Sequence, residues 1–269
     1  MTPGRTGTAR GVGGLLLAAM LAVVVAAPVL PLADPLHQDL LQALAPPMTG
    51  MVLGADQLGR SLAARVVFGG RNSLGIAAAA TLLAVGGGGL VGVAGAVSAR
   101  PIRAAVLLLA DTALALPAFL AALLIAGALP AGPSGLVAAV AATSWGEPCR
   151  VGLLTARHAA AASYVQAARL AGLAPATVVL RLVVPPVVQA LAGIAGLMVG
   201  QAVLVVAGLG FLGVGLRPPA PEWGAMIVDG LPYLDEAPLL VAVPAAAIVC
   251  TAVSLFLLAS PRLPPRAAG

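Results

Sequence analysis

The sequence predicts an all-α integral membrane protein with six transmembrane helices, and three observations predict this fold class. Hydrophobic residues make up 61% of the 269 residues and charged residues 9%, and the mean hydropathy is +1.07. A soluble domain carries roughly 25% charged residues. Apolar segments long enough to span a bilayer recur along the chain, and most arginines lie between them. We therefore expect a multi-pass protein of the plasma (inner) membrane.

A spanning helix needs about 20 apolar residues, and six segments come close to this length. They are residues 12–31, 74–98, 104–129, 134–152, 187–207 and 238–258. Arg5 and Arg10 precede the first apolar run and would also fit a signal peptide, but five further spans favour an uncleaved anchor helix over 1–31. The fourth segment is the weakest because Gly146, Glu147 and Pro148 interrupt its end.

The arginines predict the orientation, since the chain contains no lysine. With the N-terminus inside, ten of the 14 arginines are cytoplasmic and four are outside, and most acids lie outside, so both termini are expected in the cytoplasm. The cytoplasmic set is Arg5, Arg10, Arg100, Arg103, Arg150, Arg157, Arg169, Arg181, Arg262 and Arg266, and the outer set is Arg60, Arg65, Arg71 and Arg217. The positive charge thus reports topology, and no nucleic-acid partner is expected.

Two outer segments are too long to be simple connectors. Residues 32–73 end in LGRSLAARVVFGGRNSL, whose spacing predicts an amphipathic helix at the outer interface with Leu58, Leu62, Ala63 and Val66 on one face. Residues 208–237 are rich in Gly and Pro and carry Trp223 and Tyr233, which suit the interface. These segments are either surface loops without a partner or a rim that receives solute from a binding protein.

Small residues and prolines inside the spans predict how the helices pack. Gly88, Gly92 and Ala96 form one row for close helix contact, and Gly196 and Gly200 form another. The prolines that would kink or end helices are Pro117, Pro130 and Pro244.

Among the acidic residues, Asp111 is the one that lies well inside a clearly predicted span. A charge there costs roughly 2.5–3.5 kcal/mol, so it should face protein or water. A proton or cation site is one interpretation, and a structural partner for an arginine near the cytoplasmic side is the one we favour. Glu147 is expected at the same membrane boundary.

The residues needed for common catalytic or metal sites are missing. Without lysine there is no phosphate-loop lysine. His37 and His158 are expected on opposite sides of the membrane, and Cys149 and Cys250 form no motif. No catalytic residue, metal or cofactor is predicted, so energy must come from a partner or an ion gradient.

The segment from Tyr164 to Pro186, YVQAARLAGLAPATVVLRLVVPP, is the most informative part of the chain. It predicts a helix, a break at Gly172 and a second helix that Pro175 opens. A polar and basic element between two long apolar segments, on the cytoplasmic face, indicates a docking surface for another subunit.

Three blocks carry a resemblance to the second, C-type permease subunit of binding-protein-dependent ABC importers in the dipeptide, oligopeptide and nickel branch. LGADQLGRSLAARVVFGGRNSL (53–74) is similar to an outer motif of the family, YVQAARLAGLAPATVVLRLVVP (164–185) to its cytoplasmic EAA loop, and GFLGVGLRPPAPEWGAMIVDG (210–230) to a second outer motif. The chain departs from the family pattern at Ala55, Ser61, Gln166, Leu182 and Pro186, of which Gln166 replaces the acid of the EAA motif.

The resemblance implies a type I ABC importer permease in which 1–269 is one domain, with an anchor helix (1–31), a five-helix core (74–258) and a coupling-helix loop (155–186). It assigns the coupling role to Tyr164, Gln166, Ala167, Ala168, Arg169, Gly172, Pro175 and Arg181, and the outer motifs to Gly54, Asp56, Gly59, Arg60, Gly213, Gly215, Pro218, Pro219, Trp223 and Gly224. Gly172 would allow a tight turn, and the pair Ala167–Ala168 would allow a helix to pack closely. Arg169 would bond carbonyls or acids of the ATPase.

The resemblance also implies the partners, which are a second permease subunit, different from this one, two cytoplasmic ATPases, an extracytoplasmic solute-binding protein and membrane lipid. Di- and oligopeptides are the solutes we expect, with nickel or another chelated metal as the alternative. An ion-coupled carrier using Asp111 and a purely structural membrane subunit are the interpretations from other classes.

Overall fold

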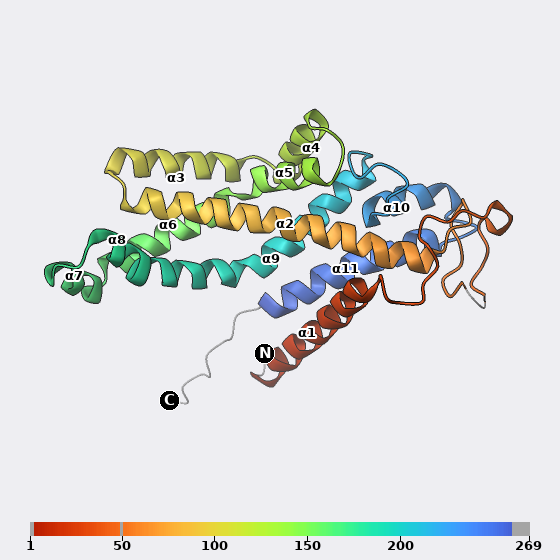
Figure 1. Cartoon of the computed structure of the whole chain (residues 1–269), viewed down its shortest axis with the longest axis horizontal. Helices are drawn as coiled ribbons and strands as arrows, with labels where there is room; N and C mark the ends of the chain where they lie inside the picture. Colours follow the sequence, from red (N-terminus) through yellow and green to blue (C-terminus); the bar gives the residue numbers. More distant parts are fainter. Residues whose placement is uncertain (1–2, 49–50, 260–269) are drawn as a thin grey trace.

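Long helices aligned along one axis dominate the molecule (Figure 1). The computed structural model describes residues 3–48 and 51–259, and this part is helical apart from loops and two isolated bridges, Met48 with Met51 and Ala55 with Ser61. The longest helices are α1 (Pro3–Ala26), α2 (Leu62–Val97), α9 (Val184–Phe211) and α11 (Leu239–Ala259). The arginines Arg262 and Arg266, used above for orientation, lie outside the described residues.

The two ends of the molecule carry different elements (Figure 1). The short helices α7 (Ser163–Leu170) and α8 (Pro175–Val178) lie at one end, beside the turn from α2 into α3. The other end carries α10 (Trp223–Gly230) and the loop that precedes α2. Two short 3₁₀ turns also occur, η1 (Leu40–Gln42) and η3 (Leu231–Tyr233).

Two of the expected spans are broken into pairs of helices. Segment 104–129 forms α3 (Arg100–Ala115) and α4 (Ala118–Ala128), which are bent by 92° relative to each other. Pro117 stands at the break as the N-cap of α4, as expected for a residue without an N–H. Segment 134–152 forms α5 (Pro133–Ser144) and the start of α6 (Gly146–Ala161), which meet at Trp145. Pro244, by contrast, lies inside the continuous helix α11.

Helix length and composition support a membrane protein with fewer unbroken spans than expected. Among the described residues, three segments are long and apolar enough to cross a bilayer alone, namely Leu62–Val97, Pro175–Phe211 and Leu239–Ala259, and the bent pair α3–α4 makes a fourth if it is one span. Arg10–Ala26 and α5 are shorter apolar helices. The prediction of six spans therefore stays a prediction.

The expected amphipathic helix at the outer interface is wrong. Its residues form the first turns of α2, which begins at Leu62 and continues to Val97 as one helix. Leu62 is buried in the core and Val66 packs against it, so the apolar face is covered by protein and not by lipid. Sequence spacing reports which residues share a face but not what covers that face.

Close backbone contacts join α2 to α6. A methyl group added at Gly88 would lie 3.1 Å from the amide nitrogen of Cys149, and one at Gly92 would lie 2.8 Å from that of Leu153. The first small-residue row is therefore a helix contact, as predicted. In the second row, Gly200 faces Leu255 of α11, whereas a methyl group at Gly196 would meet nothing within 4 Å.

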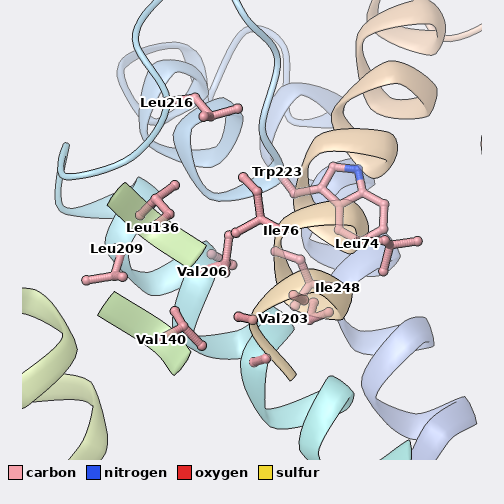
Figure 2. Packing of buried hydrophobic residues seen from close by; sticks show 14 of the residues in the cluster. Leu74, Ile76, Leu136, Val140, Val203, Val206, Leu209, Leu216, Trp223 and Ile248 are labelled. Carbon is pink, nitrogen blue, oxygen red and sulfur yellow. The ribbon is translucent and has the colours of Figure 1, made fainter. Parts of the chain in front are cut away.

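The main core lies where α2, α5, α9 and α11 meet (Figure 2). Ile76, Val206 and Ile248 come from three of these helices, and Trp223 closes the cluster from the start of α10. A smaller core towards the α7 end contains Ala156 of α6 and Val187 and Leu191 of α9. The larger core therefore supports the end where the first and third motif blocks lie, which we call the outer end after the predicted orientation.

The segment after α7 is one continuous helical rod. It starts with α8, passes through the five-residue π-helix η2 (Val179–Val183) and continues as α9 to Phe211. These 37 residues correspond to about 55 Å of helix. The rod links the two ends of the molecule.

Candidate functional site

The break after α7 has the conformation that the sequence predicts. Gly172 has a φ of +82°, which glycine adopts without strain. The amide of Gly172 donates to the carbonyl oxygen of Arg169 at 3.0 Å, and that of Leu173 donates to Ala168 at 3.2 Å. These are the two hydrogen bonds of a Schellman motif, and Pro175 then opens α8.

The segment from α7 to α8 is an exposed surface held by a few buried residues. Val165 and Val178 are fully buried or nearly so and attach the two helices to the bundle. Leu170, by contrast, is 90% exposed and Leu173 43% exposed, although both are apolar. Two apolar side chains thus lie on the surface beside the turn, where another molecule can contact them.

The predicted coupling residues mostly share this exposed surface. Tyr164, Gln166, Ala167, Arg169, Gly172, Pro175 and Arg181 are exposed, and Ala168 is half-buried. The Nε2 of Gln166 donates to the carbonyl oxygen of Ala161 at 3.1 Å, so this side chain folds back towards α6.

A buried charge cluster organises the outer end. Asp56 Oδ2 accepts from Arg60 Nε at 2.7 Å and lies 3.2 Å from Arg65 Nε, and each of the three residues is 4% exposed. Asp56 Oδ1 also accepts from the amides of Leu58 and Arg60. Gly59 has a φ of +72° and touches the backbone of Asp39. The carboxylate thus closes the loop on itself and ties it to α2.

Glu222 joins the first and third blocks. It is completely buried, and its Oε1 accepts from the hydroxyl of Ser73 at 3.0 Å and from the amide of Gly224 at 2.9 Å. Its Oε2 accepts from the amide of Ala225, also at 2.9 Å, so the side chain caps α10. The Ser73 hydroxyl in turn accepts from the amide of Trp223. Burial raises the pKa of Glu222, and these hydrogen bonds oppose the rise.

Two further hydrogen bonds complete this joint. Trp223 is 1% exposed, and its Nε1 donates to the carbonyl oxygen of Val66 at 2.9 Å. Asn72 Nδ2 donates to the carbonyl oxygen of Pro221 at 2.7 Å. Residues 66–73 of α2 and 221–225 therefore form one rigid unit, which we call the outer joint.

Glycines in the third block allow the backbone to approach closely. Gly224 packs on the carbonyl of Ala207, and Gly210 packs on the carboxylate of Glu222, so neither has space for a Cβ. A Cβ at Gly215 would lie 2.8 Å from the Cα of Gly210, and Gly213 has a φ of +78°.

The structure separates the predicted residues into two sites. The outer motif residues lie together at the outer joint or next to it. Gly54, Asp56, Gly59, Arg60, Gly215, Trp223 and Gly224 are buried, whereas Gly213, Pro218 and Pro219 are exposed. The coupling residues lie at the opposite end (Figure 1).

Sequence reasoning missed Arg65, Asn72, Ser73 and Glu222 as structural partners. The available signal for Glu222 was its place directly before the Trp–Gly pair of a Pro-rich block. A side chain with an oxygen acceptor before a helix start is a typical cap.

Asp111 forms an ion pair with Arg150. The distance from Asp111 Oδ1 to Arg150 Nη1 is 2.9 Å, and the side chains are 50% and 52% exposed. The expected arginine partner is therefore confirmed.

Comparisons with known proteins give a consistent match. Residues 72–262 match the family model described as binding-protein-dependent transport system inner membrane component. The chain is 32% identical over 207 residues to the di/tripeptide transport system permease protein DppC of Pseudomonas aeruginosa (strain UCBPP-PA14), an alignment that covers 77% of this chain and 68% of that protein.

Two relatives from Escherichia coli (strain K12) are similar. The probable D,D-dipeptide transport system permease protein DdpC is 32% identical over 247 residues, or 89% of this chain and 80% of the relative. The nickel transport system permease protein NikC is 30% identical over 206 residues, or 77% of this chain and 74% of the relative.

Proposed function

This chain belongs to the family of binding-protein-dependent transport system inner membrane components, in the dipeptide, oligopeptide and nickel branch of ABC permeases, and from this premise we propose that it forms half of the solute path of a peptide importer. It is a membrane-embedded permease subunit of an ABC importer. The observation that carries the finer proposal is the exposed α7–Gly172–α8 segment at the start of the helical rod.

We propose that the α7–α8 segment, within the loop 155–186, is the coupling element that docks on the ATPases. The exposed Leu170 supplies an apolar contact, and Arg169 supplies donors for acids or carbonyls of the partner. Movement of α8 is passed into α9 because the two helices are continuous through η2. Such a rigid-body switch between two packed states is the basis of alternating access.

At the other end, the outer joint is the surface we assign to the solute-binding protein. Its buried hydrogen bonds hold the exposed loop around Gly213, Pro218 and Pro219 in a fixed position. A second, related permease subunit would complete the path as a heterodimer.

Six spans with both termini in the cytoplasm are part of the proposal, which treats the chain as one permease domain. The start of α1 and the end of α11 point towards the same side as α7 (Figure 1). The two helices also contact each other, since Gly13 packs against Leu257. Counting the pairs α3–α4 and α5–α6 as single broken spans gives six with α1, α2, α9 and α11.

Peptides are the solute class we propose, and nickel is the second candidate because one relative is named as a nickel permease. An ion-coupled carrier is not favoured, since Asp111 is already paired with Arg150.

Uptake of labelled di- and tripeptides and of labelled nickel, in a deletion strain and its complemented partner, tests the proposal. Loss of peptide uptake alone, restored by the gene, is expected. Loss of nickel uptake alone would move the chain to the metal branch, and unchanged uptake of both would overturn both solute assignments.

A further inference from the structure

A hollow of about 750 Å³ lies next to the α7–α8 segment (Ser163–Val178), which we call the coupling segment. Its walls come from the end of α2, the start of α3, the end of α6, and the stretch from α7 to η2. The elements that form these walls meet at the end of the molecule where α7 and α8 lie (Figure 1). Three arginines line it, Arg103 of α3, Arg157 of α6 and Arg169 of α7.

The charge of this hollow is uncompensated. Within residues 3–48 and 51–259, no acid lines it, and none of its three arginines forms an ion pair. Three guanidinium groups from three different helices around one concave space favour a bound anion. The planar guanidinium donates bidentately to phosphate oxygens, which makes a phosphate group a suitable ligand.

The position and the walls of the hollow restrict the anion further. Val97 ends α2, Arg103 is in the first turn of α3, and Pro175 starts the rod, so the hollow is level with one end of three span candidates. Its remaining lining is largely apolar, and Val97 and Leu173 are 52% and 43% exposed. A ligand that fits must carry both an anionic headgroup and an apolar part.

We propose that this hollow binds an anionic phospholipid, whose phosphate contacts Arg103 and Arg157 while its acyl chains follow Val97 into the bilayer. Basic pockets between helix ends at the cytoplasmic boundary are suited to acidic lipid headgroups. The proposal rests on the proposed function for its orientation in the membrane. An acidic surface of an ATPase is the competing occupant, but it would leave the apolar walls uncovered.

Lipid binding by the purified chain alone tests this proposal. The delipidated protein in detergent is titrated with palmitoyl-oleoyl-phosphatidylglycerol or with phosphatidylcholine of the same chains, and bound lipid is counted by native mass spectrometry. The variants are the double substitution Arg103→Gln/Arg157→Gln and the matched control Arg100→Gln, an exposed arginine at the start of α3 that does not line the hollow. No ATPase, binding protein or solute is present, so failure of the importer proposal leaves this result unaffected.

Wild type is expected to retain phosphatidylglycerol in preference to phosphatidylcholine. The double substitution should weaken that binding by about fivefold per arginine, with little change in the control. Equal retention by the double variant, an equal loss in the Arg100→Gln control, or equal binding of phosphatidylcholine would each overturn the proposal.

The variant Arg103→Lys/Arg157→Lys separates loss of charge from loss of fold. It should bind phosphatidylglycerol better than the Gln pair, because it keeps both positive charges. Binding no better than that of the Gln pair would count against the site. If the Gln pair retained lipid like wild type but lost the ATPase in a separate co-purification from cells, the hollow would be assigned to the ATPase instead.

Discussion

The outer joint and the coupling segment use the same kinds of residue in opposite ways. At the outer joint, Glu222 and Trp223 are buried, and every polar group discussed there has a partner inside the chain. In the coupling segment, Leu170 and Arg169 are exposed and directed to no partner within the described chain. The first region is complete as it stands, whereas the second has a surface that another subunit can complete.

This difference predicts where a substitution changes folding and where it changes function. A buried, hydrogen-bonded network loses stability when one member is removed. An exposed docking surface loses only the interaction with its partner. The following substitutions test that contrast, starting with the largest expected effect.

Asp56→Ala should destabilise the outer end by about 3–5 kcal/mol, because it leaves the buried Arg60 and Arg65 without their carboxylate. Thermal unfolding in detergent and abundance in the membrane measure this loss. Asp235→Ala, a substitution of an acid with no ion pair among the described residues, is the control. Wild-type stability of Asp56→Ala would remove the contrast between the two regions.

Gly172→Val should abolish uptake and leave membrane abundance unchanged. The φ of +82° strains a β-branched residue by about 1–2 kcal/mol, while the space around the site is open, so the turn changes without a clash. Gly172→Asn is the matched control, because Asn tolerates this φ better and should keep most of the uptake. Normal uptake by the Val variant at normal abundance would show that the tight turn is not needed for coupling.

Leu170→Ala should lower uptake about tenfold through loss of an apolar contact with the ATPase, with no change in thermal unfolding. Leu41, which is 97% exposed in the outer loop, provides the control, since Leu41→Ala should alter neither quantity. If Leu170→Ala destabilised the isolated chain, this leucine would belong to the fold and not to the docking surface.

Glu222→Gln should change how stability depends on pH. Burial raises the pKa of Glu222, so the folded state binds this proton more tightly than the unfolded state. Its contribution to stability is therefore lost as pH rises from the ordinary glutamate pKa through the raised one. Thermal unfolding of wild type should show this decline relative to Glu222→Gln, and parallel pH profiles of the two proteins would contradict it.

Gln166→Glu should have the smallest effect. The substitution removes the hydrogen bond to Ala161 and adds a negative charge that can pair with the ATPase. An exposed ion pair of this kind contributes about 0.2–1 kcal/mol to binding. Stimulated ATP hydrolysis by the assembled importer is expected to equal wild type or exceed it. A severe loss would show that the amide of Gln166 is required.

Local features of the sequence were sufficient for the coupling segment. A glycine between two helix-forming stretches and a proline at the next helix start specify the turn at Gly172 with few alternatives. The contact at Gly88 and Gly92 was likewise visible as a row of small residues.

The outer joint could not be predicted in the same way. Ser73 and Glu222 are 149 residues apart, and only the packed fold brings them together. Hydropathy also gave no information on the 92° bend between α3 and α4, since apolarity does not specify helix direction, although Pro117 marked its position. The extent of α2 was missed because its first turns carry Arg65 and Arg71, so that the apolar run begins only at residue 74, although Arg65 is buried beside Asp56.

The π-helix η2 has a consequence for how this sequence can change in evolution. A π turn accommodates one extra residue within an otherwise regular helix. Deleting one residue from Val179–Val183 would restore regular winding and rotate everything before it by about 100° relative to α9. Insertions and deletions should therefore be rejected throughout the 37-residue rod. Selection should therefore act on the exact length of the rod as strongly as on the identity of its residues.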